Sequence, residues 1–319
     1  MPGGPAMTRA TVFACVFLLF QSALAHDVDL TKLPLGDGHL SSAPQVGYIW
    51  ACRVDPGGGG AQLDGPWINK AAGTYDFTKK AVVSGQVTWR PNFKMALNGA
   101  ARVFTSNDLP NHPTGNFPVS PTDEAYRYDR NPNSIREQSV TVTLPANPVA
   151  AAAPTCAPGA VGILLTGSVL FNALDAPGRD AVAHEAQDSC QGHPQISGVY
   201  HYHSVTTCMD DKRLPGGHST LVGYALDGFG IFGRFGEKGE ALSSSDLDAC
   251  HGHSHAIPWD GKTVVMYHYH ATPDFPYSVG CFHGSYSLEN VRAISGPPPQ
   301  GRGRGQPIGG NGGFGPPGR

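Results

Sequence analysis

Histidine is concentrated in one stretch of this 319-residue chain, in a pattern that suits the binding of a metal ion. Eleven of the 14 histidines fall between positions 184 and 283. Two strings in this stretch read Tyr-His-Tyr-His and supply His201, His203, His268 and His270. The valines and tyrosines around them favour strands, on which residues i and i+2 share a face with Cα atoms about 6.5 to 7 Å apart. Two imidazoles at that spacing can bind one metal ion.

Each string belongs to a longer pattern that occurs twice, at 173–208 and 225–281. An Ala-Leu-Asp turn is followed by Asp-x-Cys-x-Gly-His, then by Tyr-His-Tyr-His, then by a cysteine. The duplication predicts two β units related by an approximate two-fold axis, at which equivalent residues converge. We therefore expect the four strand histidines to surround a single ion, with His193 and His253 as further ligands.

The chemistry of the donors favours copper or zinc over calcium or magnesium, because neutral imidazole is the main ligand type. His251, His253 and His255 form a further i, i+2, i+4 set. The carboxylates expected beside the ligands are those of Glu185, Asp188 and Asp248. The two aspartates could fix imidazole tautomers, and capping of turns is an equal alternative for both.

Three classes of function remain open on the sequence alone. The first is a metal-binding protein that closes the coordination shell with its histidines. The second is a metalloenzyme that leaves one position open for water or substrate, with a histidine or Glu185 as general base. The third is a metal-free structural or ligand-binding β module, in which tyrosine and histidine form a hydrogen-bond network. Position 188 is aspartate, so His184-Glu185 does not begin a zincin motif, and the chain contains no nucleophile elbow, P-loop or dinucleotide-binding motif.

Cysteine usage predicts a disulfide-stapled protein of an oxidising compartment. Beyond the amino-terminal segment the cysteines are Cys52, Cys156, Cys190, Cys208, Cys250 and Cys281. The repeated pattern favours Cys190–Cys208 and Cys250–Cys281, which leaves Cys52–Cys156, although six cysteines allow fifteen pairings. No Cys-x-x-Cys is present, which disfavours thiolate ligation of a metal.

Composition indicates a mainly β fold with few short helices. The chain has 42 glycines and 28 prolines and only 15% charged residues, which excludes a coiled coil or a helical bundle rich in Ala, Glu and Lys. Short runs typical of strands lie between turn-forming clusters, at 46–52, 81–90, 101–105 and 139–144. The run at 139–144 alternates strictly, so one face of that strand should be exposed.

The chain divides into four predicted segments. Residues 1–25 read as a signal peptide, because an apolar run at 11–20 is followed by an Ala-x-Ala cleavage pattern. An amino-terminal β-rich region at 26–155 precedes the histidine-rich domain with two repeats at 156–294, and the Gly/Pro/Arg-rich tail at 295–319 should be disordered. We expect a secreted or periplasmic protein without a membrane span in the mature chain. The formal net charge of −3 argues against nucleic acid as a partner, which leaves a metal ion or small ligand.

The paired Tyr-His-Tyr-His strings, together with 225–233, 248–253 and 275–281, resemble the YHYH domain family. The resemblance covers about 160–285 and extends weakly to Cys52 and Trp67. It implies an exported protein but no particular activity, so only the four strand histidines are carried over as functional positions. Gly230 departs from the family's pattern, where proline is expected, and this puts only the stiffness of one turn in doubt.

Overall fold

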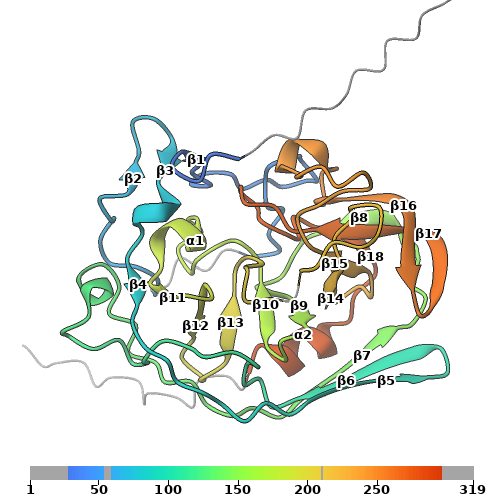
Figure 1. Ribbon diagram of the computed structural model, residues 1–319, viewed down its shortest axis with the longest axis horizontal. Helices are drawn as coiled ribbons and strands as arrows, with labels where there is room; N and C mark the ends of the chain where they lie inside the picture. The colour runs from blue at the N-terminus through green and yellow to red at the C-terminus, as the bar shows by residue number, and fades with distance from the viewer. Residues whose placement is uncertain (1–27, 54–58, 210, 297–319) are drawn as a thin grey trace, which may run out of the picture.

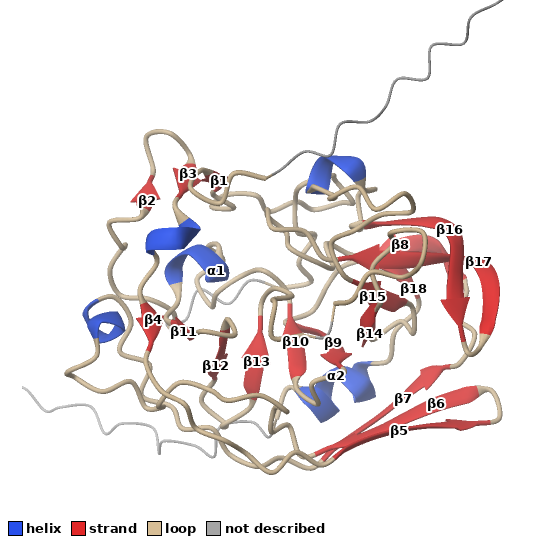
Figure 2. Ribbon diagram, viewed as in Figure 1, coloured by secondary structure: helices blue, strands red, loops and turns tan. Residues whose placement is uncertain are grey.

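The computed structural model describes residues 28–53, 59–209 and 211–296 (Figure 1). The predicted signal peptide at 1–25 and the tail from 297 onward lie outside the described residues. Strands dominate, and the α-helices of the described chain are the short α1 (Ala181–His184) and α2 (Leu288–Ile294) (Figure 2). The prediction of a mainly β, disulfide-stapled fold with few short helices is confirmed.

An eight-stranded sheet forms the centre of the structure. Its strands, in spatial order, are β12 (Gly192–Pro194), β13 (Tyr200–Tyr202), β10 (Val169–Phe171), β9 (Ala160–Leu164), β14 (Leu221–Ala225), β15 (Gly230–Phe232), β17 (Lys262–His270) and β16 (Gly252–Trp259). Two central strands, β9 and β14, pair antiparallel. Read outward from that junction, each half contains an antiparallel, then a parallel, then an antiparallel pairing. The two halves therefore share a pairing pattern, while the internal pseudo-two-fold repeat itself stays a prediction.

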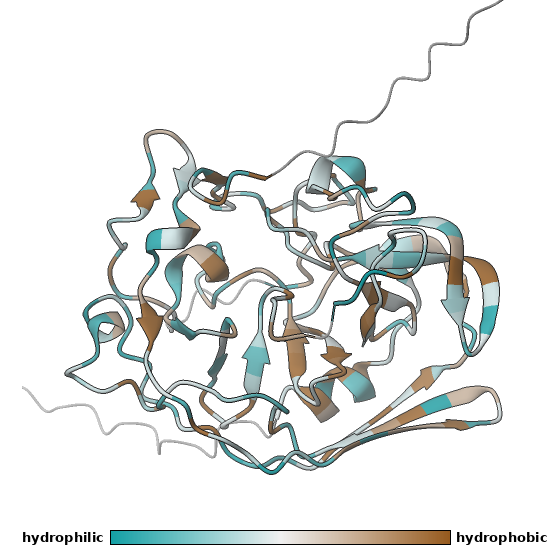
Figure 3. Ribbon diagram, in the orientation of Figure 1, coloured by the Kyte–Doolittle hydropathy of each residue, from teal (hydrophilic) through white to brown (hydrophobic). Residues whose placement is uncertain are grey.

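The centre of this sheet is apolar and tightly packed. All five residues of β9 are buried, and Figure 3 colours β9 and β10 as hydrophobic. Glycine allows the β9 and β14 backbones to approach closely. A Cβ on Gly162 would lie 2.8 Å from the Tyr224 carbonyl oxygen, and one on Gly223 would lie 2.8 Å from that of Ile163. Larger residues at these two positions would push the two halves apart.

Four smaller sheets surround the central one. A three-stranded meander contains β5 (Phe93–Asn98), β6 (Ala101–Ser106) and β7 (Val140–Pro145), and β7 alternates buried and exposed residues as predicted. The other strands form β1 (Leu33–Pro34), β3 (Thr74–Tyr75) and β2 (Ile68–Asn69) in one sheet, β11 (Gln187–Asp188) with β4 (Val82–Val83), and β18 (Phe282–Gly284) with β8 (Ala150–Thr155). Three 3₁₀ turns, η1 (Phe77–Lys79), η2 (Glu124–Arg127) and η3 (Ser244–Asp246), complete the assignments among the described residues.

The main hydrophobic core crosses the predicted boundary between residues 155 and 156. It contains Phe104 and Val142 from the amino-terminal region together with Ile163 and Ile294 from the histidine-rich region. Helix α2 contacts β7 and β9, and its Asn290 amide donates to the Thr143 carbonyl at 2.8 Å. The two regions therefore fold around one common core.

The β16–β17 hairpin is closed by an Asp-Gly turn and attached to the meander by a buried arginine. Asp260 and Gly261 have φ values of 48° and 76°, the conformation that a two-residue hairpin turn of this kind requires. Arg102 on β6 is 1% exposed and donates two hydrogen bonds to the Asp260 carboxylate, at 2.9 and 2.7 Å. Its guanidinium also lies over the Tyr224 and Trp259 rings. These contacts fix the position of the hairpin that carries most of the second half's histidines.

Three disulfides form as predicted: Cys190–Cys208 and Cys250–Cys281, which the repeated pattern favoured, and Cys52–Cys156, the pair that remained. In two of them, Cys190–Cys208 and Cys250–Cys281, the first cysteine belongs to an Asp-x-Cys turn. These two disulfides therefore lie close in sequence to the strands that carry the histidines. Within the described ranges, no helix has the length and apolarity needed to cross a bilayer.

Candidate metal centres

The fold separates the two Tyr-His-Tyr-His strings instead of bringing them together. The first lies at β13 and the second on β17, five positions apart in the sheet order. At a strand spacing of about 4.8 Å this corresponds to roughly 20 Å along the sheet, and Figure 1 places them left of centre and at the right. The candidate ligand atoms accordingly fall into two groups, neither of which contains histidines of both strings. The prediction that His201, His203, His268 and His270 surround one ion is therefore wrong. Strands β9 and β14, not the histidine strands, meet at the centre of the sheet.

Each half instead gathers its own histidines. The first cluster consists of His193, His201, His203 and Glu185, and the second of His218, His253, His255, His268 and His270. The strand register is the same in both, because His193 pairs with His201 and His253 pairs with His268. Candidate ligand atoms of His193, His201 and His203 lie within 4.8 Å of one another, and so do those of His218, His255, His268 and His270.

In the first cluster two imidazoles face each other with their Nε2 atoms. The Nε2 atoms of His201 and His203 are 3.2 Å apart. The Nδ1 of His201 lies 3.3 Å from the Val199 carbonyl oxygen, and that of His203 lies 2.5 Å from the Asn172 carbonyl oxygen. A carbonyl can only accept, so these contacts assign the proton to Nδ1 in both rings. Both Nε2 atoms then direct lone pairs at each other, an arrangement that a bound cation stabilises.

The spacing of these atoms suits a tetrahedral ion. Ligands about 2.1 Å from a tetrahedral zinc ion are about 3.4 Å from each other. Glu185 Oε2 lies 3.3 Å from Nε2 of His203 and 3.4 Å from Nε2 of His193. His193 differs from its neighbours, because its Nδ1 faces the Asn131 side-chain amide at 3.4 Å. An amide N–H can only donate, so Nδ1 of His193 accepts and its proton lies on Nε2, facing Glu185. The donors of the first cluster are therefore the Nε2 atoms of His201 and His203 and the Glu185 carboxylate.

Glu185 belongs among the candidate ligands, whereas the sequence predicted that its carboxylate lies beside the ligands without binding the ion. It follows α1, whose last turn its backbone N–H caps by donating to the Ala181 carbonyl. Burial, together with the Asp129 and Asp175 carboxylates, raises the pKa of Glu185 well above its usual range in the metal-free protein. A cation in this cluster would favour the ionised form and displace that proton.

A cavity of about 740 Å³ opens beside the first cluster. All four cluster residues line it, as do Phe171 and Ala176. The Phe171 ring packs on His201, with ring centroids 4.1 Å apart. This volume is in the range of small-molecule binding sites.

The second cluster consists of imidazoles, and the hairpin supplies four of its five members. His253 and His255 lie on β16, His268 and His270 on β17, and His218 precedes β14. In four of these rings Nδ1 faces a backbone carbonyl: His218 with Ser219 at 2.7 Å, His255 with Ala256 at 3.1 Å, His268 with Met266 at 3.1 Å and His270 with Gly233 at 2.6 Å. The Nε2 atoms of His218, His268 and His270 are buried without a hydrogen-bond partner.

Burial favours the neutral form of four imidazoles in the metal-free second cluster, those of His218, His253, His268 and His270. Burial and, to a smaller extent, the neighbouring histidines together lower the pKa of His268 to about 2 and that of His253 to about 4. The pKa of His270 is also well below its usual value, for the same reasons. Neutral imidazole is the form that binds a metal ion.

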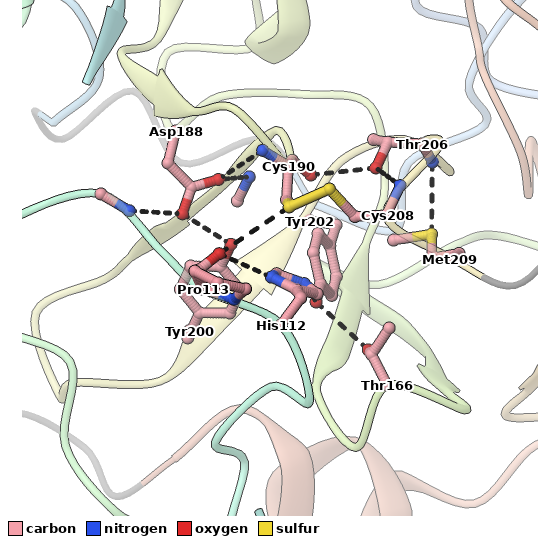
Figure 4. The surroundings of a disulfide bond; sticks show 12 residues. His112, Pro113, Thr166, Asp188, Cys190, Tyr200, Tyr202, Thr206, Cys208 and Met209 are labelled. Carbon is pink, nitrogen blue, oxygen red and sulfur yellow. Dashed lines mark hydrogen bonds between the residues drawn. A yellow bond between two sulfur atoms is a disulfide. The ribbon is translucent and has the colours of Figure 1, made fainter. Parts of the chain in front are cut away.

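The aspartates of the two Asp-x-Cys-x-Gly-His segments cap turns. Asp188 accepts hydrogen bonds from the backbone N–H groups of Cys190 and Gly192 and from the Tyr200 hydroxyl (Figure 4). Asp248 accepts the corresponding bonds from Cys250, Gly252 and Tyr267. Among the described residues, the hydrogen bonds of these two carboxylates do not include a cluster imidazole. Backbone carbonyls fix the tautomers of six cluster rings instead. A tyrosine of each string thus donates a hydrogen bond to the aspartate of the preceding Asp-x-Cys turn, while the histidines on the opposite face form the cluster.

His218 and His255 were missing from the predicted ligand set. The His-x-His spacing at 253 and 255 was a usable signal for His255, whereas nothing local marks His218, which enters through tertiary packing. His251, the first member of the 251–255 set, turns away and its Nε2 lies 3.0 Å from the Thr272 hydroxyl.

Comparison with known proteins gives one match. A family model described as YHYH protein matches residues 141–242, a segment that contains the first Tyr-His-Tyr-His string and ends before the second. No curated protein and no solved structure matches the chain.

Proposed function

The chain carries a YHYH domain, and we propose that it is an exported protein that binds two transition-metal ions, copper or zinc, one in each histidine cluster. Export is supported by the three disulfides and by the signal-like sequence at 1–25. The earlier expectation of one shared ion is replaced by one ion per cluster, because the clusters lie in different halves of the central sheet.

The orientation of the imidazoles carries this proposal. Six cluster rings have Nδ1 against a backbone carbonyl, namely His201, His203, His218, His255, His268 and His270. This arrangement leaves Nε2 with a lone pair and no proton, and it is the usual way in which proteins orient metal-binding histidines. A metal-free network would instead pair Nε2 with a donor, and three of these buried atoms have no partner.

The donor types favour copper and zinc. Imidazole nitrogen binds these ions well, whereas calcium and magnesium prefer several oxygen ligands. The six cysteines of the described chain are joined in disulfides and so cannot act as thiolate ligands. The choice between the two metals is an outcome of the experiment below.

Elemental analysis of untagged protein tests the proposal. We expect about two ions of copper or zinc per chain after dialysis against a weak chelator. The double variant His201→Gln with His203→Gln should retain about one ion, and so should His268→Gln with His270→Gln, because each removes one cluster. Tyr200→Phe and Tyr267→Phe serve as matched controls and should retain both ions. Folded wild-type protein that takes up neither metal would refute the proposal.

A further inference from the structure

The two clusters differ in how completely they can surround an ion. We infer that the first cluster holds its ion with one coordination position open to the 740 Å³ cavity, where water or the oxygen of a small neutral organic molecule binds, whereas the second cluster closes the shell with its own imidazoles. This inference rests on the proposed metal binding and assigns an exchangeable ligand to one of its two centres.

The number of donors differs between the clusters. In the second, four imidazoles lie within mutual reach of one ion, and Nε2 of a fifth, His253, is 3.1 Å from that of His255. Four nitrogen ligands complete the shell of tetrahedral zinc or tetragonal copper. In the first, the Nε2 atoms of His201 and His203 and the Glu185 carboxylate supply three donors, the number found in zinc sites that keep a position for water. The Nε2–H of His193 points at Glu185 Oε2, so His193 orients this carboxylate and does not add a fourth ligand.

Access to the cavity differs as well. Every residue of the first cluster lines the 740 Å³ cavity, so a position left open there faces space for a ligand. A second cavity, of about 710 Å³, is lined within the described chain by residues that include no histidine of the second cluster.

The lining of the first cavity favours a neutral ligand. Three carboxylates, those of Asp129, Asp175 and Glu185, face this cavity together with one arginine, Arg53. Asp175 is paired with Arg179 at 2.7 Å. A divalent ion would bring the local charge close to balance, so an added anion gains little from the field of the site. The Phe171 ring offers an apolar wall for the body of the ligand.

Relaxation of solvent water protons in copper-loaded protein tests this assignment, because exchangeable water on paramagnetic copper speeds that relaxation. The variant with His268→Gln and His270→Gln keeps the first cluster, and the variant with His201→Gln and His203→Gln keeps the second. At equal bound copper, we expect several-fold faster relaxation per ion in the first variant. Equal relaxation in the two, or faster relaxation in the second, would overturn the inference. Loss of copper from both would overturn the proposed metal binding as well.

A cavity-filling variant keeps the test independent of how the double variants fold. Ala176 is exposed at the cavity, so Ala176→Trp should occupy part of it without touching a ligand. We expect this variant to bind copper in the wild-type amount and to lose most of the relaxation effect. Wild-type relaxation in this variant would contradict an open position on the cavity side.

The class of ligand is tested by displacement of the bound water. In the wild-type copper protein, acetamide should reverse the relaxation effect at a lower concentration than acetate, because the cavity carries carboxylates of its own. The opposite order would overturn the assignment of a neutral ligand.

Discussion

At the scale of single residues, backbone carbonyls decide which way each imidazole points. His203 and His270 end the two Tyr-His-Tyr-His strings, and their Nδ1 atoms lie against the carbonyls of Asn172 and Gly233. These carbonyls directly follow β10 and β15, the strands that occupy equivalent places in the two halves of the central sheet. Equivalent histidines are therefore oriented by equivalent parts of the backbone, without the help of carboxylates.

Burial of a histidine also makes stability depend on pH, and His251 offers a clean test because it belongs to neither cluster. Burial lowers its pKa to about 3, so the folded protein leaves it neutral below pH 6.5, where the unfolded chain protonates it. Its contribution to stability is therefore lost as pH falls from about 6.5 to 3. His251→Asn should reduce the pH dependence of the unfolding free energy in that window, by up to about 1.4 kcal/mol per pH unit.

Asparagine suits this position because His251 has a φ of 76°, a conformation that asparagine tolerates. Urea unfolding of metal-free wild type and variant at a series of pH values measures the difference. An unchanged slope between pH 6.5 and 4 would contradict the assignment of His251 as a buried neutral ring.

At the scale of elements, each Tyr-His-Tyr-His strand places its tyrosines on one face and its histidines on the other, and the two faces make different contacts. The hydroxyls of Tyr200 and Tyr267 donate to Asp188 and Asp248, at 2.9 Å in both cases, and so tie each strand to the turn before it. Replacing either tyrosine with phenylalanine should cost about 1 to 3 kcal/mol of unfolding free energy. Metal content should stay unchanged. Loss of metal without loss of stability would instead put the metal chemistry on the tyrosine face.

The hairpin that carries four histidines of the second cluster depends on the contact between Arg102 and Asp260. Asp260→Asn keeps a residue that tolerates the turn's positive φ but removes the charge facing a buried guanidinium. We expect a loss of about 1 to 3 kcal/mol in unfolding free energy, measured by chemical denaturation. Val265→Thr on the same hairpin is the control, because Val265 is 77% exposed and should change little. Equal effects of the two substitutions would argue against this role of the contact.

Much of the element level could be predicted from the sequence. The strict alternation at 139–144 marks β7, and the run at 101–105 corresponds to β6. The strand predicted at 81–90 is wrong for most of its length, since only Val82–Val83 forms a strand. The strand predicted at 46–52 is reduced to isolated bridges at Ile49 and Ala51. Here glycine-rich loops and tertiary contacts outweigh the strand preference of single residues.

Most members of the candidate sites could be predicted from the sequence, but the prediction that both strings contribute to one site was wrong. The His-x-His spacing and the Gly-His pattern identified six of the clustered histidines, because strand periodicity is local. Which strands lie next to each other depends on the whole fold. In this fold β9 and β14, not β13 and β17, lie at the centre of the sheet. His218 joins its cluster from a distant loop, where no local pattern could indicate it.

At the scale of the whole molecule, the main hydrophobic core joins the two predicted regions, and the strand order of the central sheet separates the two histidine clusters. The core includes residues from both predicted regions, and Cys52–Cys156 links the amino-terminal region to the start of the histidine-rich region. Two of the disulfides sit beside the two Asp-x-Cys turns, one in each half. The molecule thus presents two separate histidine clusters with different surroundings, one beside a cavity with Glu185 among its members and one made of imidazoles.

Anomalous X-ray scattering from crystals of zinc- or copper-loaded protein tests the central claim most directly. The account predicts two peaks roughly 20 Å apart, one about 2.1 Å from Nε2 of His201 and His203 and the other equally close to Nε2 of His268 and His270. A single peak between the two halves, or loaded crystals without a peak at either cluster, would contradict it.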